Sequence, residues 1–98
     1  MYARVNTFLG SPGRFDDDLA DVRDNTIPAL EEVAGYNGLI ILNDRASGRS
    51  VAITFWESED DLRASEEEAA RVRHDNAAGT DNTVLSVERY EVALDSTR

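Results

Sequence analysis

The sequence predicts one α+β domain over residues 1–98, with four antiparallel strands and two helices that cover one face of the sheet. Three observations predict this fold class. Stretches with the alternation and β-branched residues of strands are interrupted by two stretches of helical spacing, in the order β-α-β-β-α-β. The two middle strands are joined by only a few turn residues, as in an antiparallel hairpin. A chain of 98 residues suffices for one modest core.

The first strand is predicted over residues 2–9, which alternate and are rich in β-branched and aromatic side chains. The turn sequence Ser11-Pro12-Gly13 ends this strand. We expect Ser11 to cap the helix that follows, with Pro12 at its first position, because a helix N-terminus tolerates the missing N–H of proline.

The first helix is predicted from apolar residues that recur at helical spacing, namely Phe15, Leu19, Val22, Leu30 and Val33. Pro28 lies within this pattern. Because proline lacks a backbone N–H and clashes with the preceding turn, we expect a kink or break near residues 25–27. Gly35 is expected to end the helix.

A β-hairpin is predicted next. Its first strand spans Tyr36 to Asp44 and contains four consecutive aliphatic residues at 39–42. Ala46-Ser47-Gly48 forms the connection, and the second strand of the hairpin runs from about Arg49 to Glu57.

The second helix is predicted to begin after Ser58, which caps it, with Asp61 three residues on in a weak capping-box arrangement. Its narrow apolar stripe consists of Leu62, Ala69 and Val72. Residues 75–82 are predicted to form a loop, and 83 to about 94 the fourth strand.

This order of elements is the split βαβ arrangement of ferredoxin-like folds, with an antiparallel four-stranded sheet. The strands are apolar on both sides, although two helices can cover only one face. Roughly 600 Å² of apolar sheet would then be exposed, more than monomers usually expose, and its burial would contribute on the order of 15 kcal/mol before association costs. We therefore expect a homodimer in which this second face is covered by another copy.

The composition is strongly acidic, with 20 acidic and ten basic residues and a net charge of −10. A field of that sign repels phosphate backbones and anionic lipids, which argues against nucleic acid and membrane partners. Cysteine is absent and the N-terminus has no signal-peptide pattern, so we expect a cytoplasmic protein. One histidine and no cysteine argue against a protein-bound metal.

Several segments of the chain resemble the antibiotic biosynthesis monooxygenase superfamily. The most specific is the Trp-Glu-Ser that closes the third strand and opens the second helix, and the similarity extends over essentially the whole chain. The segments are Asp44-Arg45-Ala46-Ser47-Gly48, Thr54-Phe55-Trp56-Glu57-Ser58-Glu59, Ala64-Ser65-Glu66, Pro28-Ala29-Leu30 and Gly35-Tyr36-Asn37-Gly38. The resemblance implies a dimeric α+β barrel in which each subunit keeps a pocket between its helices and its sheet. Its members include cofactor-free oxygenases of small phenolic or anthrone-type compounds, enzymes acting on quinols, and haem-degrading enzymes.

The resemblance carries over to particular residues. Trp56 matches a tryptophan of the cofactor-free branch, whose neighbouring Asn and Tyr positions are Ala52 and Leu62 here. Asn6 matches the first-strand asparagine of the haem-degrading branch. In that branch the second-helix tryptophan falls at Ser65 and the axial histidine at Asp75, one position after His74.

Five residues are candidates for a site. Asn6 and Trp56 are the candidate catalytic residues, and Arg4, His74 and Tyr36 are candidates for a substrate pocket. Each has an ordinary structural alternative: a strand or capping hydrogen bond for Asn6, core packing for Trp56 and Tyr36, and an exposed position at a helix C-terminus for His74.

Arg4 shares the strand face of Asn6 and could bind an anionic ligand through two parallel hydrogen bonds. The alternative for Arg4 is an ion pair with an acidic residue of the fourth strand, Glu88 or Glu91.

Two functional hypotheses follow. The first is a cofactor-independent monooxygenase that oxidises a small aromatic or quinol-type compound with O₂. The alternative is a non-catalytic dimer that binds a small ligand or haem. The sequence favours enzyme and non-enzyme about equally, because a fold by itself does not carry a function.

Overall fold

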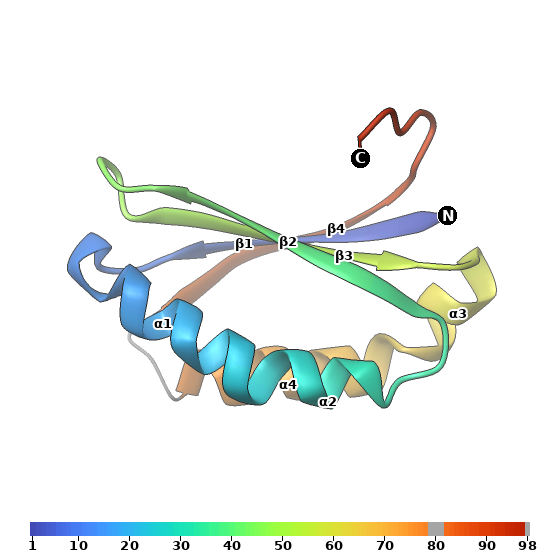
Figure 1. Cartoon of the computed structure of the whole chain (residues 1–98), viewed down its shortest axis with the longest axis horizontal. Coiled ribbons are helices and arrows are strands. Elements are labelled where there is room, and N and C mark those ends of the chain that lie inside the picture. Colours follow the sequence, from blue (N-terminus) through green and yellow to red (C-terminus); the bar gives the residue numbers. More distant parts are fainter. Residues whose placement is uncertain (79–81, 98) are drawn as a thin grey trace.

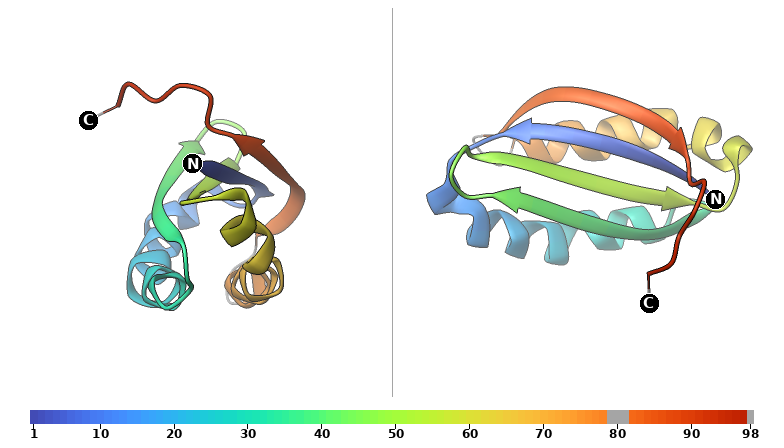
Figure 2. Two further views of the ribbon diagram at one scale, coloured as in Figure 1. Left: turned by 90° about the vertical axis from the view of Figure 1, so that its right-hand side faces the viewer. Right: turned by 90° about the horizontal axis from the view of Figure 1, so that it is seen from above.

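The computed structural model describes residues 1–78 and 82–97 (Figure 1). Its sheet consists of β1 (Tyr2–Leu9), β2 (Tyr36–Asp44), β3 (Arg49–Trp56) and β4 (Thr83–Glu91). The spatial order is β2-β3-β1-β4, and each pair of neighbours is antiparallel. The helices lie together on one face of this sheet, as Figures 1 and 2 show. The predicted ferredoxin-like α+β fold is confirmed.

The first helical region consists of a 3₁₀ turn η1 (Pro12–Arg14), α1 (Phe15–Asp21), a π-helical segment η2 (Val22–Thr26) and α2 (Ile27–Glu31). Ser11 lies at the start of this region. Its backbone carbonyl accepts from Arg14 N–H at 2.9 Å, and its side chain makes no capping hydrogen bond. The expected break before Pro28 is the π-helical segment. Ile27 N–H donates to the carbonyl of Val22, five residues back. The helix is therefore wider just before Pro28, which has no backbone N–H to donate.

The second helical region is divided into α3 (Glu59–Ala64) and α4 (Glu66–Ala78), where the sequence predicted one helix. The predicted Ser58 cap is confirmed, because its Oγ accepts from Asp61 N at 3.1 Å. The loop predicted over 75–82 is wrong in its first half, since α4 continues to Ala78, and residues 79–81 lie outside the described residues.

The fourth strand is shorter than predicted and ends at Glu91 instead of near Leu94. Val92 N–H still donates to Met1 O at 2.9 Å. The following residues leave the sheet on the side opposite the helices (Figures 1 and 2).

The two faces of the sheet differ in what covers them. Residues paired in register share a face, so Arg4 and Thr54 point with Asn6 toward the helices, whereas Ile40 and Ile53 lie on the outer face. The outer face remains apolar and open: Ile40 is 43% exposed, Leu42 53% and Tyr90 52%. Among the described helices, none combines the length and the apolar character needed to cross a bilayer.

Candidate functional site

A row of polar side chains is buried between the sheet and the helices. Arg4 is 1% exposed, Asn6 on the same strand is 6% exposed, and Thr54 lies opposite Arg4 in the register and is also buried. Burial removes hydration from charged and amide groups, so such residues need partners inside the protein. The partners of this row define the candidate site.

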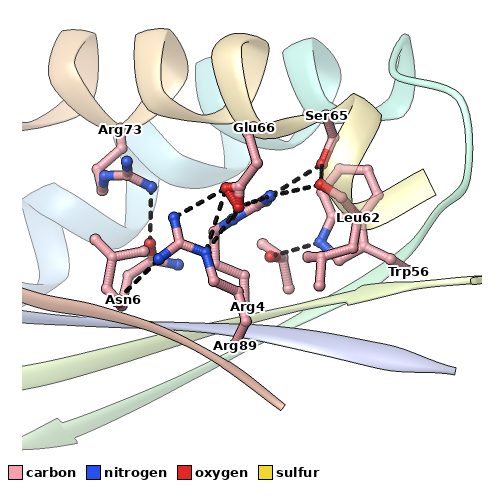
Figure 3. A network of polar contacts seen from close by, with 10 residues as sticks. Arg4, Asn6, Trp56, Leu62, Ser65, Glu66, Arg73 and Arg89 are labelled. Atoms are coloured by element: carbon pink, nitrogen blue, oxygen red, sulfur yellow. Dashed lines mark hydrogen bonds and ion pairs between the residues drawn. The ribbon is translucent and has the colours of Figure 1, made fainter. Parts of the chain in front are cut away.

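Arg4 is held by the break between α3 and α4. Its Nη2 donates to Leu62 O at 3.0 Å and to Ser65 Oγ at 3.1 Å. The same nitrogen lies 2.9 Å from Glu66 Oε1, and Nε donates to that oxygen at 3.3 Å (Figure 3). The Arg4 guanidinium also lies 5.3 Å from the centroid of the Trp56 ring, a cation–π distance. The break at Ser65 therefore presents two acceptors to Arg4: the Ser65 hydroxyl and the Leu62 carbonyl, which also accepts from Ser65 Oγ at 2.7 Å.

Glu66 bridges two arginines. Besides Arg4, it accepts from Arg89 of β4, with Nε at 2.7 Å from Oε1 and Nη2 at 2.9 Å from Oε2. Hydrogen bonds from Arg89 and then from Arg4 outweigh partial burial and lower the pKa of Glu66 to about 2. The predicted ion pair of Arg4 with Glu88 or Glu91 is wrong, because the helix and not the fourth strand supplies the carboxylate.

This ion pair makes the stability of the protein depend on acidic pH. The pKa of Glu66 is lower in the folded chain than its ordinary value of 4.5, so its contribution is complete above about pH 4.5 and is lost as pH falls toward about 2. We expect Glu66→Gln to flatten the acid limb of stability, measured as the urea midpoint across that range.

Glu68→Gln is the matched control, because Glu68 lies on the same helix and pairs with exposed Arg71. An acid limb equally steep in Glu66→Gln and in the unsubstituted protein would contradict the assignment.

Asn6 connects the sheet to Arg73 of α4. Asn6 Nδ2 donates to Ala52 O at 3.0 Å, and its Oδ1 accepts from Arg73 Nη1 at 3.1 Å (Figure 3). Burial lowers the pKa of Arg73, and the positive charges of Arg4 and Arg89 lower it further. This end of the site has a net formal charge of +2, because it contains three arginines, Arg4, Arg73 and Arg89, and one carboxylate, Glu66. The whole chain has a net charge of −10.

A cleft between the sheet and the helices contains this polar end. It encloses about 790 Å³ of space free of atoms, including its open mouth. Ligand pockets in proteins typically have mostly apolar walls with a few polar groups, and the lining of this cleft has that composition. The polar lining includes Arg4, Asn6, Thr54 and Arg73, and the apolar lining is Phe8, Phe15, Leu19, Val22, Leu30, Leu39, Ile41, Ala52, Ala69 and Val72.

The structure brings together only some of the sequence candidates. Arg4 and Asn6 line the cleft. Trp56 is fully buried behind Arg4, with Nε1 donating to Thr54 Oγ1 at 3.0 Å, and Tyr36 packs edge-on against it at 5.9 Å between ring centroids. Neither aromatic residue is among those that line the cleft. His74 is exposed and outside the lining as well.

Four residues of the site were not among the sequence candidates: Ser65, Glu66, Arg73 and Arg89. Glu66 belongs to a run of three glutamates, a pattern typical of a solvated helix face, and Arg73 directly precedes His74. Among the described residues, no group of three or more His, Cys, Asp or Glu side chains is placed to hold a metal ion.

No protein-family model matches the sequence. Two uncharacterized proteins of Mycobacterium tuberculosis, Rv2558 and Rv2557, are 40% and 36% identical to it over 94 and 93 residues. These matches cover 96% and 95% of this chain but 39% and 41% of the relatives, so the chain spans about two-fifths of the length of the curated relatives it matches.

Solved structures share the fold over the whole chain. The heme-degrader MhuD from Mycobacterium tuberculosis, solved with two hemes in its active site, has a TM-score of 0.75 at 22% identity and covers 99% of this chain and 100% of its own. SnoaB, a cofactor-independent oxygenase from Streptomyces nogalater, has a TM-score of 0.68 at 18% identity, covering 99% and 97%. The monooxygenase ActVA-Orf6 of Streptomyces coelicolor, in complex with Nanaomycin D, has a TM-score of 0.65 at 15% identity, covering 98% and 92%.

Proposed function

We propose that this chain, which has the fold of the antibiotic biosynthesis monooxygenases, oxidises a small aromatic or quinol-type substrate with O₂ in the cleft between its sheet and helices, without a bound cofactor. The observation that carries the proposal is the cleft itself, whose apolar walls end in a buried polar row. The structural similarity to a cofactor-independent oxygenase and to ActVA-Orf6 supports it. The curated relatives add no activity.

The reaction requires little from the protein beyond binding of the substrate. In an anthrone-type substrate, a ring CH₂ loses a proton and the resulting carbanion transfers electrons to O₂ as a C–O bond forms. Loss of water from the hydroperoxide leaves a carbonyl, so CH₂ and O₂ become C=O and H₂O. The apolar walls would exclude water and hold the ring, and Asn6, fixed by Ala52 and Arg73, would orient a substrate oxygen.

An acidic substrate is expected, because the described lining offers the Asp18 carboxylate and no histidine as a base. Anthrones and quinols meet that requirement through delocalisation of the anion. This matches the substrate class to the side chains that are present.

Haem fits the cleft poorly. His74, the one histidine of the chain, is exposed and outside the lining, and the described lining contains no Cys, Met or Tyr that could serve as an axial ligand. A non-catalytic small-ligand protein is the second candidate, favoured by Ala52 and Leu62 at the two positions that neighbour Trp56 in the resemblance.

The test is oxygen uptake with a panel of anthrones and hydroquinones. We expect uptake above the spontaneous rate, and we expect Ala52→Phe, which fills the cleft from β3, to abolish it. Ala34→Phe is the matched control, because it makes the same change at an exposed residue outside the cleft lining. Binding without uptake across the panel would overturn oxidation in favour of the non-catalytic alternative.

We also infer that the outer face of the sheet pairs with a second copy of the chain. Its apolar residues include Ile40, Leu42, Ile53 and Tyr90, and they form a surface of the kind that marks an interface. A two-fold pair would bury the same patch on both copies.

A further inference from the structure

The polar end of the cleft holds a buried donor that nothing in the described structure uses. Arg4 is 1% exposed, and its Nε and Nη2 are bound to Glu66, Leu62 and Ser65. Its Nη1 is buried and has no hydrogen-bond partner among the described residues. An unmade hydrogen bond at a buried charged group costs several times what a made one contributes, so this nitrogen calls for a partner from outside the chain.

Arg73 supplies a second cation at the same place. It lines the cleft, and its Nη1 donates to the neutral Oδ1 of Asn6 at 3.1 Å (Figure 3). Within the described part of the chain, Arg73 forms no ion pair with a carboxylate, whereas Glu66 already serves both Arg4 and Arg89. Arg4 and Asn6 are two residues apart on one face of β1, which spaces them by about 7 Å. Arg4, with its unpartnered Nη1, and Arg73, which contacts the next residue on Arg4's face of β1, therefore line the same end of the cleft.

The negative charge of the lining lies elsewhere. Asp18 is the acidic residue among those that line the cleft, and it accepts from Asn82 Nδ2 at 3.3 Å. Asn82 precedes β4, whose first residue Thr83 pairs with Leu9 at the far end of β1 from Arg4. The cleft is thus polarised along β1, from cationic near Arg4 to acidic beyond Phe8.

We propose that Arg4 Nη1 and Arg73 form an anion subsite, and that the substrate of the cleft is an aromatic acid whose carboxylate binds there while its ring lies against the apolar walls. This rests on the proposed function for the site but concerns binding alone. A carboxylate has two oxygens for two guanidinium groups, is ionised at neutral pH, and offsets half of the formal charge of +2 left after Glu66. A phenol must first lose its proton, and the resulting phenolate offers a single oxygen.

The test is isothermal titration of three ligands of one shape: 2-naphthoate, its neutral amide 2-naphthamide, and 2-naphthol. We expect naphthoate to bind about tenfold or more tightly than the amide, because charge-assisted hydrogen bonds are the stronger kind. Arg73→Gln should reduce that preference about fivefold or more, and Arg73→Lys should keep part of it. Arg71→Gln is the control, on the same helix two residues away, exposed and paired with Glu68.

Equal binding of naphthoate and naphthamide would overturn the subsite, as would tighter binding of naphthol than of naphthoate. An unchanged preference in Arg73→Gln would overturn the role of Arg73. Titration requires no turnover, so these results are independent of oxygen uptake. Naphthoate binding without any oxidation would leave the subsite in place and contradict the proposed activity.

Discussion

Replacing Trp56 by alanine is expected to lower the free energy of unfolding by about 3–5 kcal/mol, the range for large aromatic-to-alanine changes in a core. Trp56 is fully buried and is the largest such side chain in the described structure. Its removal would open a void beneath Arg4, take away the edge contact of Tyr36, and leave Thr54 Oγ1 without its donor. Since small domains are stable by about 5–15 kcal/mol, the variant should be barely folded. Urea unfolding followed by circular dichroism measures the loss.

Trp56→Phe measures the contribution of the indole N–H separately from that of the buried aromatic ring. It keeps most of the buried area and loses the hydrogen bond to Thr54, so we expect a cost of about 1–2 kcal/mol. A Trp56→Ala variant as stable as Trp56→Phe would show that the core at the junction of β3 and α3 does not depend on this side chain.

Ile40→Glu is expected to weaken dimerisation by about 100-fold or more, because a two-fold interface would contain the buried charge twice. Ile40 lies opposite Ile53 on the outer face and is 43% exposed in the single chain, so the substitution should be tolerated by the monomer. Sedimentation velocity over a concentration series measures the change.

Ala34→Glu is the control for added charge, since Ala34 is exposed and lies in the turn between α2 and β2, outside the strands. An unsubstituted protein that sediments as a monomer at micromolar concentration would contradict the paired outer face. The cleft would then have to function within one chain.

The first three strands could be predicted from local sequence almost to the residue, whereas the fourth was predicted too long at its C-terminal end. Residues 2–9 and 36–44 match β1 and β2, because alternation and the flanking Gly and Pro residues set both ends locally. The interruption at Ser65 could not be predicted. At this interruption Arg4 reaches Ser65 Oγ across 61 residues of sequence, and no local pattern records that contact.

The site was predicted in part for the same reason. Arg4 and Asn6 stood out because charged and amide residues are unusual on the buried face of a strand. Arg73 was missed in favour of its neighbour His74. On a helix one residue turns the side chain by about 100°, and in this helix the turn takes His74 to the surface and Arg73 into the cleft.

The partner of Arg4 was assigned to the wrong element. Glu88 and Glu91 lie on β4 beside Arg4's own strand, but Glu88 accepts from the Tyr90 hydroxyl at 3.0 Å, on the outer face. Arg89 lies opposite Arg4 in the register, and Glu66 of α4 forms an ion pair with each of them. The parity of β4 residues would have identified Arg89 had the register been known.

The most direct test of the central claim is turnover under isotopically labelled O₂ with the anthrone or hydroquinone that gives the fastest uptake. We expect that the product carries one labelled oxygen atom, that the other appears in water, and that Ala52→Phe forms no product while Ala34→Phe does. A product without label, or equal product from Ala52→Phe and the unsubstituted protein, would contradict oxidation in this cleft.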